Sequence, residues 1–283
     1  MRSAKAGMLV NATLAIVKLV AGIVGNSYAL VADAVESTAD ILGSLIVWGG
    51  LRVASREPDD VYPFGYGRAE TLAGAVVAIM LVGAAIGIGI ESIREIRTPH
   101  STPAPWTLLV LVLVVIAKWA LSRRVQSVAT DIGSSAVAAD AWHHLSDAIT
   151  STAAFVGIAI AVGGGPGWES ADDWAALIAS GVILANGVHL LLRSSGELMD
   201  RTPDGGVVDR VRTVAGSVQG VRAIEKLALR KSGLHLRLTI HVQADPAMSL
   251  HDAHILGGTV KSAIRAAIPA VQSVLVHMEP FEE

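Results

Sequence analysis

Six long apolar stretches fill the chain before about residue 193, and they constrain its fold more than any other feature. Crossing the hydrocarbon core of a bilayer takes about 20 mostly apolar residues in a helix. Each stretch approaches or exceeds that length, so the sequence predicts six transmembrane helices. They lie roughly at residues 7–25, 28–52, 68–96, 105–122, 132–163 and 172–193.

The composition agrees with a membrane domain and excludes several classes of function. Only 17% of the 283 residues are charged, against about a quarter in a typical soluble domain. The net charge of −3 and the lack of a basic run exclude nucleic acid as a partner. The chain contains no cysteine, so any bound metal must be held by His, Asp, Glu, backbone or water.

The distribution of lysine and arginine predicts the orientation of the chain in the membrane. Basic residues close to the ends of transmembrane helices favour the cytoplasmic side. Most of them fall on the side that also holds both termini, so we expect both termini to be cytoplasmic. These residues are Arg2, Lys5, Arg52, Arg56, Arg68, Arg123, Arg124, Arg193 and Arg201. The loop before the sixth span is instead acidic, with Glu169, Asp172 and Asp173.

The tail after residue 203 has the pattern of a small folded domain. Residues 234–242 alternate between apolar and polar side chains, which is typical of a half-buried strand. Together with the neighbouring segments they predict the order α-β-β-α-β, an α+β, ferredoxin-like unit with helices on one sheet face. We therefore expect a six-helix transmembrane domain over residues 1–203 and a cytosolic domain over residues 204–283.

Two of the predicted spans carry ionisable groups with identical spacing. Asp33, Glu36 and Asp40 lie at i, i+3 and i+7 in the second span, which places them along one helix face. Asp140, His143 and Asp147 repeat this spacing in the fifth span. A charge inside a bilayer is costly and marks a functional site by default. The two stripes therefore predict a cation site between the two helices.

The donor types in these stripes favour a zinc-like ion. Glu36, Asp40, His143 and Asp147 would supply four ligands of the kinds that tetrahedral zinc accepts. A single imidazole disfavours magnesium and calcium, which prefer oxygen alone. The alternative is that the acids pair with basic residues and hold helices together. Lys18 and Lys118 are the only obvious basic partners in the sequence, and two cations cannot neutralise five carboxylates. For Asp33 or Asp140 taken singly, an ion pair stays open. We expect the Lys118 side chain to extend toward the cytoplasm.

Four motifs in order along the chain resemble the cation diffusion facilitator family of divalent metal/proton antiporters. Residues 29–40 (ALVADAVESTAD) and 139–147 (ADAWHHLSD) resemble its second-helix and fifth-helix motifs. Residues 63–70 (PFGYGRAE) resemble its loop before the third helix, and residues 198–201 (LMDR) resemble its exit from the sixth. The resemblance places the transport site at Glu36, Asp40, His143 and Asp147. Glu36 departs from the usual Asp or His, so Asp33 could share its role, and Asp33 and Asp140 are each expected as a supporting group or a substitute ligand.

The same resemblance implies two features at the membrane–cytosol boundary. The family's second metal site would fall near Asp59, but Tyr62 and Tyr66 stand where histidines are common. Neutral tyrosine is a poor zinc ligand, so we expect this site to be absent or very weak. The family's ion pair between the loop and the sixth helix maps onto Arg68 and Asp200. A solvated surface pair worth less than about 1 kcal/mol is the alternative.

In the tail, the resemblance implies a cytosolic binuclear metal site. It maps onto Glu225, His241, His254, His277 and Glu279. The histidine and glutamate at 277 and 279 lie two residues apart on one strand and hence on one face. His235 and His251 have no matching role and are expected to be solvated.

The function implied is efflux of a divalent metal ion in exchange for protons by a homodimer with alternating access. Zinc is expected first, followed by Cd²⁺, Fe²⁺, Co²⁺ and Mn²⁺, in a bacterial inner membrane. A membrane-bound sensor or scaffold that binds ions without moving them is the alternative, because it could keep the same ligands. An intramembrane metalloenzyme is disfavoured, since the chain has no HExxH motif and no evident base outside the ligand set.

Overall fold

A computed structural model of the chain describes residues 2–98, 102–132, 151–165, 167–203, 205–233 and 235–282. The predicted site residues Asp140, His143 and Asp147 lie outside this described part. The chain divides into two compact units. The bundle unit comprises Met1–Leu45 and Val76–Leu190, and the tail unit comprises Ile46–Ala75 and Leu191–Glu283.

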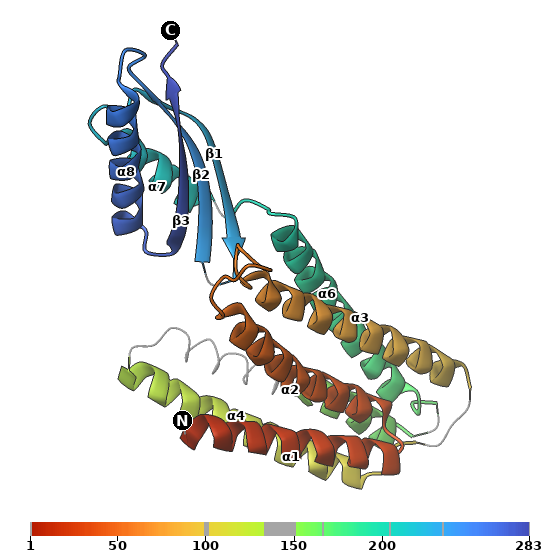
Figure 1. Cartoon of the computed structure of the whole chain (residues 1–283). Helices are drawn as coiled ribbons and strands as arrows, with labels where there is room; N and C mark the ends of the chain where they lie inside the picture. The colour runs from red at the N-terminus through yellow and green to blue at the C-terminus, as the bar shows by residue number, and fades with distance from the viewer. Residues whose placement is uncertain are drawn as a thin grey trace. The chain divides into compact units, whose positions relative to one another are not determined.

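Long helices make up the first part of the chain (Figure 1). Among the described residues, three apolar helices are long enough to cross a membrane: Arg68–Arg97, Trp106–Arg123 and Ala171–Leu198. Asn11–Val24 and Ser151–Gly163 are shorter apolar helices within the described residues. The predicted helical membrane domain is confirmed, although these lengths alone do not establish all six spans. The labelled helices are α1 (Arg2–Val24), α2 (Tyr28–Ala54), α3 (Arg68–Arg97), α4 (Trp106–Ile132) and α6 (Ala171–Leu198).

Small side chains form much of the core of the bundle unit. Most members of the largest buried cluster in this unit are alanines, packed around Leu30, Leu111 and Ile158. Small residues let helix backbones approach closely, which is how helices associate in lipid. At Gly157 a Cβ atom would lie 2.3 Å from the Cβ of Ala175, so this contact requires glycine. Large apolar side chains such as Ile79 and Leu109 are exposed instead, as expected for surfaces that face lipid.

A buried carboxylate fixes the turn between α1 and α2. Asp172, in the first turn of α6, accepts hydrogen bonds from the Ser27 hydroxyl (2.9 Å) and the Tyr28 N–H (2.7 Å). These groups begin α2, where backbone N–H groups have no partner inside the helix. The negative charge also complements the positive end of the helix dipole. Asp172, which the sequence suggested as an acid of the loop before the sixth span, therefore caps the start of α2, 145 residues away along the chain from Ser27.

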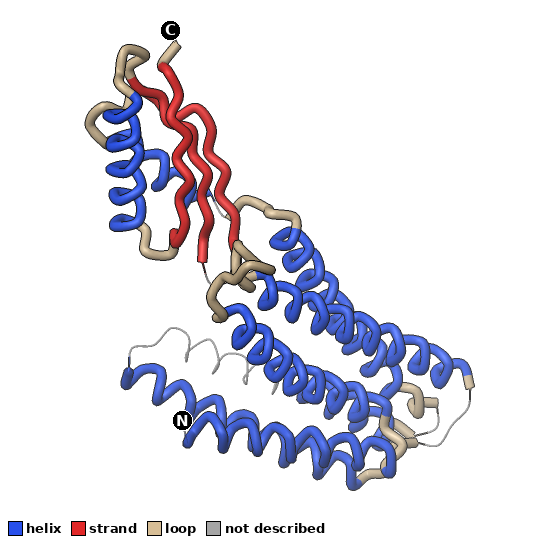
Figure 2. Tube along the Cα trace, in the orientation of Figure 1, coloured by secondary structure: helices blue, strands red, loops and turns tan. Residues whose placement is uncertain are grey.

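The tail unit contains a three-stranded sheet with two helices (Figure 2). Strand β2 pairs antiparallel with β1 and parallel with β3, giving the order β1-β2-β3. Val211 of α7 and Val260 of α8 join Ile240 of β2 in one buried core, so both helices cover the same sheet face. The predicted α+β tail is thus confirmed. Its elements are α7 (Gly205–Gly216), β1 (Ala223–Ser232), β2 (His235–Ala244), α8 (Leu250–Ala267) and β3 (Val271–Pro280).

We predict that Ile240→Ala destabilises the tail strongly, because Ile240 is fully buried at the centre of this core. Removing such a side chain costs about 2–5 kcal/mol through lost burial and the cavity left behind. Amide hydrogen exchange in the full-length protein would show it as faster exchange across β2 and β3. Leu275→Ala is the matched control, because Leu275 is 64% exposed; equal effects of the two changes would contradict the assigned core.

Candidate metal sites

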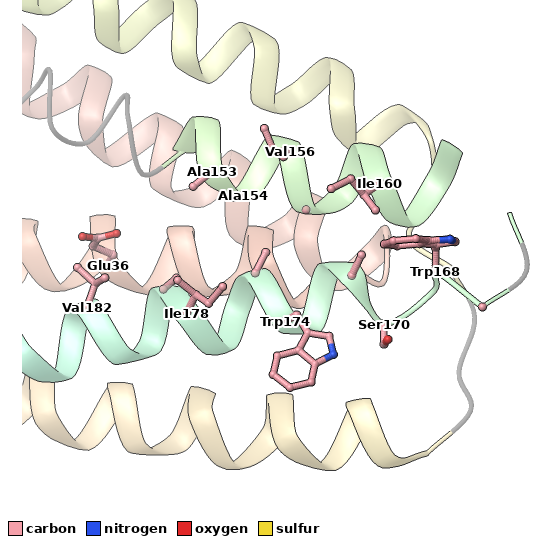
Figure 3. A pocket seen from close by; sticks show the side chains of 15 residues that line it. Glu36, Ala153, Ala154, Val156, Ile160, Trp168, Ser170, Trp174, Ile178 and Val182 are labelled. Atoms are coloured by element: carbon pink, nitrogen blue, oxygen red, sulfur yellow. The ribbon is translucent and has the colours of Figure 1, made fainter. Parts of the chain in front are cut away.

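Glu36 stands at one end of an apolar cavity of about 580 Å³ in the bundle unit. Figure 3 shows its carboxylate at one end and Trp168 at the other, with side chains of α6 such as Ile178 between them. In the part of the chain that the structure describes, Glu36 is the only ionisable residue that lines the cavity. A carboxylate in apolar surroundings is poorly solvated and gains strongly from a bound cation. That Glu36 binds the transported cation stays a prediction.

Asp40 follows Glu36 by one turn on α2, and both side chains are half-buried. The i, i+4 spacing places the two carboxylates on neighbouring turns of one face. Two of the four predicted transport ligands are thus described as a pair on one helix. The structure does not test whether His143 and Asp147 join them, because those residues lie outside the described part.

Asp33 is held by a lysine and a serine. The Lys18 ammonium lies 2.8 Å from Asp33 Oδ2, and the Ser151 hydroxyl lies within hydrogen-bonding distance of both carboxylate oxygens, at 2.9 and 3.0 Å. Lys18 also donates to the Ser37 hydroxyl at 2.7 Å. Asp33 therefore matches the ion-pair alternative. Lys118 is buried, with its ammonium 3.4 Å from the Ser37 hydroxyl, so it does not extend to an exposed surface as expected of it.

Asp59 organises the loop before α3. Its carboxylate accepts hydrogen bonds from the Val61 N–H (3.0 Å), the Tyr62 N–H (2.7 Å) and the Tyr66 hydroxyl (2.6 Å). The hydrogen bond from Tyr66, followed by that from the Tyr62 backbone, lowers the pKa of Asp59. The carboxylate thus already has three donors from the loop. The absence of a metal site here stays a prediction.

Asp200 joins three segments of the tail unit. It follows the end of α6 in a left-handed backbone conformation, with φ 60°. Its carboxylate contacts Arg68 at the start of α3 and Arg230 of β1, the latter at 2.8 Å. Partial burial raises the pKa of Asp200, but the hydrogen bonds from Arg230 and Arg68 outweigh this and hold the pKa below its ordinary value. The predicted contact between Arg68 and Asp200 is present. Arg230 also contacts Asp200, which the motif did not indicate.

The same junction contains a second acid and a close backbone contact. Glu197 of α6 accepts from Lys231 of β1 at 3.2 Å and from Thr71 of α3 at 3.3 Å. A Cβ atom at Gly67 would lie 2.6 Å from the Ser232 hydroxyl oxygen, so the β1–β2 turn lies directly against the loop before α3. The sequence signal for this junction was the basic pair at residues 230–231, just before the turn.

The open face of the sheet gathers metal-binding side chains. Parallel pairing of β2 and β3 places His241 opposite His277. Glu279 Oε1 lies 2.6 Å from His241 Nδ1 and 3.5 Å from His277 Nε2. One donor atom from each of these three residues lies within 4.8 Å of the others. Two imidazoles and a carboxylate in this arrangement fit a zinc-like ion.

The two other predicted cytosolic ligands are placed differently. A hydrogen bond with Glu279, followed by one with Lys226, lowers the pKa of Glu225, which places Glu225 beside the group. His254 lies exposed on α8 and does not belong to the three-residue group. The described residues therefore assemble three of the five predicted ligands and bring a fourth next to them.

We predict that Asp200→Asn loosens the junction, because the carboxylate serves both Arg68 and Arg230. These groups are more than a third exposed, so we expect a loss of about 0.5–1 kcal/mol. The pKa of Asp200 is lowered in the folded state, so its contribution is present above the ordinary pKa of about 4 and is lost as the pH falls through the folded pKa.

Hydrogen exchange along β1 in the full-length protein measures this effect. Asp209→Asn is the matched control, because the Asp209 carboxylate of α7 makes no ion pair with the described residues. Exchange along β1 that is unchanged at neutral pH in the Asp200 variant would contradict a stabilising junction.

Comparison with known proteins identifies both parts of the chain. Residues 4–199 match the cation efflux transmembrane domain, and residues 203–281 match the cation efflux protein cytoplasmic domain. The chain is 28% identical to the manganese efflux system protein MneP of Bacillus subtilis, covering 98% of this chain and 94% of MneP. It is 29% identical to the magnetosome protein MamB of Magnetospira, covering 93% of this chain and 89% of MamB.

A solved cadmium form of the MamM C-terminal domain is also similar, at 27% identity. It covers 27% of this chain and 96% of that structure, with a TM-score of 0.27. The transmembrane-domain match alone covers more than half of the chain. The protein therefore belongs to the cation efflux, or cation diffusion facilitator, family, whose members are transporters and not enzymes.

Proposed function

We propose that this protein exports a divalent metal ion, zinc first, across a bacterial inner membrane in exchange for protons. The observation that carries the proposal is the Glu36 carboxylate, which among the described residues is the only ionisable group lining an apolar cavity and lies one turn from Asp40. Asp33, three residues earlier, is held by Lys18 and does not line this cavity. A carboxylate that faces a cavity is instead suited to a mobile cation.

In this proposal Glu36 and Asp40 of α2 bind the cargo together with His143 and Asp147 of the fifth span. The mixed nitrogen and oxygen donors favour zinc over magnesium and calcium. Cadmium, iron, cobalt and manganese follow in that order. The name of the Bacillus relative, a manganese efflux protein, supports keeping manganese among the candidates.

Exchange with protons follows from the chemistry of these ligands. Carboxylates and imidazole must lose their protons to bind a metal ion, so metal and protons compete for the same lone pairs. Cytosolic metal would displace protons from the ligands, and protons from outside would release the metal after the helices rearrange. The cavity beside Glu36 offers space next to the ligand for an ion to enter or leave.

The division of labour proposed is transport by residues 1–203 and metal sensing by residues 204–283, with both termini cytoplasmic. His241, His277 and Glu279 would bind a regulatory ion on the sheet face that the helices leave open, with Glu225 beside them. His254 would have to come from another surface, for example that of a second copy. The family match of the tail supports a homodimer, and metal shared between copies would favour one state of that dimer.

We predict that zinc drives saturable proton flux in proteoliposomes carrying a pH dye, and that Asp40→Ala and His143→Ala abolish it. Each change removes one ligand of a four-ligand site, and a buried site with a ligand missing binds metal poorly. His251→Ala is the matched control, because His251 lies exposed on α8 outside the metal group and should leave the flux intact.

Two other outcomes would reject parts of the proposal. If native protein binds zinc but moves none under any imposed pH gradient, it is a sensor or scaffold and the carrier hypothesis fails. If zinc is transported without proton exchange, the export hypothesis is supported and the antiport hypothesis is rejected.

We predict that His277→Ala weakens zinc binding by the tail at least about tenfold, since it removes one of three converging donors. The measurement is zinc titration of the full-length protein in an Asp40→Ala background, which removes the membrane site. His235→Ala provides the control on the same sheet, because His235 lies outside the group. Unchanged affinity in the His277 variant would exclude a cytosolic site at this place.

A further inference from the structure

Lys18 and Asp33 form the centre of a buried polar network inside the bundle unit. Lys18 is fully buried on α1, and its ammonium has three hydrogens to donate. It lies 2.8 Å from Asp33 Oδ2, 2.7 Å from Ser37 Oγ and 3.3 Å from the Asp33 carbonyl oxygen. Each hydrogen of the ammonium therefore has an acceptor, and every one of these acceptors belongs to α2.

Asp33 is equally engaged from a third helix. Ser151, in the described helical stretch Ser151–Gly163, lies 2.9 Å from Asp33 Oδ1 and 3.0 Å from Oδ2. Ser151 is fully buried and Asp33 is 4% exposed. Both oxygens of Asp33 thus contact protein donors in a dry environment, where such contacts are strong.

The acidic residues of α2 are therefore divided between two environments. Asp33 and Glu36 are only three residues apart, yet Asp33 contacts Lys18 whereas Glu36 lines the cavity. Asp33 is not among the residues that line that cavity. Lys118 also reaches this network, at 3.4 Å from the Ser37 hydroxyl, but the Lys18 ammonium is the cation in direct contact with the Asp33 carboxylate. Without it, Asp33 would lose that contact one helical turn from Glu36.

We propose that Lys18 is a positioning residue that sets ion preference by holding Asp33 out of the cargo site. The inference rests on the proposed function, because it concerns the same site. With Asp33 tied to Lys18, the cargo meets two carboxylates on α2, Glu36 and Asp40. Releasing Asp33 adds a third carboxylate, and additional oxygen donors favour manganese-like ions over zinc.

The test compares manganese with zinc in the full-length protein, by flux in proteoliposomes and by equilibrium binding in detergent. Lys18→Met removes the charge but keeps an apolar stem of similar length. We expect the ratio of manganese to zinc in kcat/KM and in affinity to rise about tenfold, the effect of one added carboxylate donor on a hard ion. Lys18→Arg keeps the charge and should retain the native ratio.

Lys18→Met combined with Asp33→Asn replaces the ion pair by a neutral pair and should restore the native ratio. Asp33→Asn alone should leave zinc affinity within about threefold of native, since Asp33 contributes no ligand in this proposal. If Lys18→Met does not fold, the double variant and Asp33→Asn decide the question.

Three results would overturn the proposal. The first is an unchanged ratio in folded Lys18→Met protein. The second is a shifted ratio that persists in the double variant, because the shift would then not depend on the Asp33 charge. The third is a loss of zinc affinity in Asp33→Asn as large as in Asp40→Ala, which would make Asp33 a ligand. Binding in detergent decides all three even if the native protein moves no ions, so failure of the transport hypothesis is a separate outcome.

Discussion

The cost of placing charge inside an apolar bundle governs the membrane part of this protein. A carboxylate there needs a fixed positive partner, a set of hydrogen-bond donors or a cation from outside. Asp33 has the first in Lys18, and Asp172 has the second at the start of α2. Glu36 instead lines an apolar cavity, and among the described residues it is the one ionisable group there. The acids of one bundle thus lie in different surroundings, and the proposed cargo site uses the one beside the cavity.

The junction at Asp200 shows that sequence domains and compact units need not coincide. The family matches meet between residues 199 and 203, but the tail unit also takes in Ile46–Ala75 and Leu191–Asp200. Arg230 and Lys231 of β1 contact acids at the end of α6, and the β1–β2 turn lies against Gly67. The start of α3 and the end of α6 therefore contact β1 and its turn within one compact unit. A change in the tail would reach those ends directly through ion pairs and backbone contacts.

Features encoded locally were predictable from the sequence. Apolar length indicated the helices, alternation indicated β2, and the repeated spacing in two spans indicated where charges gather. The partners of those charges were not predictable, because they depend on tertiary packing. The sequence around Arg230 and Lys231 does not indicate that Asp200 is the partner of Arg230. The position of Asp172 indicated an acid in the loop before the sixth span and not a cap for α2. The choice between ion pair and ligand for Asp33 required the position of Lys18 on another helix.

The cap that Asp172 provides has a consequence for the biogenesis of the protein. Ser27 and Asp172 are 145 residues apart, so the first two helices emerge from the ribosome long before the cap exists. Until α6 is inserted, the Ser27 hydroxyl and the Tyr28 N–H must be satisfied by water or lipid headgroups. The helical hairpin of α1 and α2 can therefore thread into the bilayer early, but it acquires its final anchor only from the last membrane helix. Insertion of α6 therefore both completes the bundle and stabilises the turn between α1 and α2.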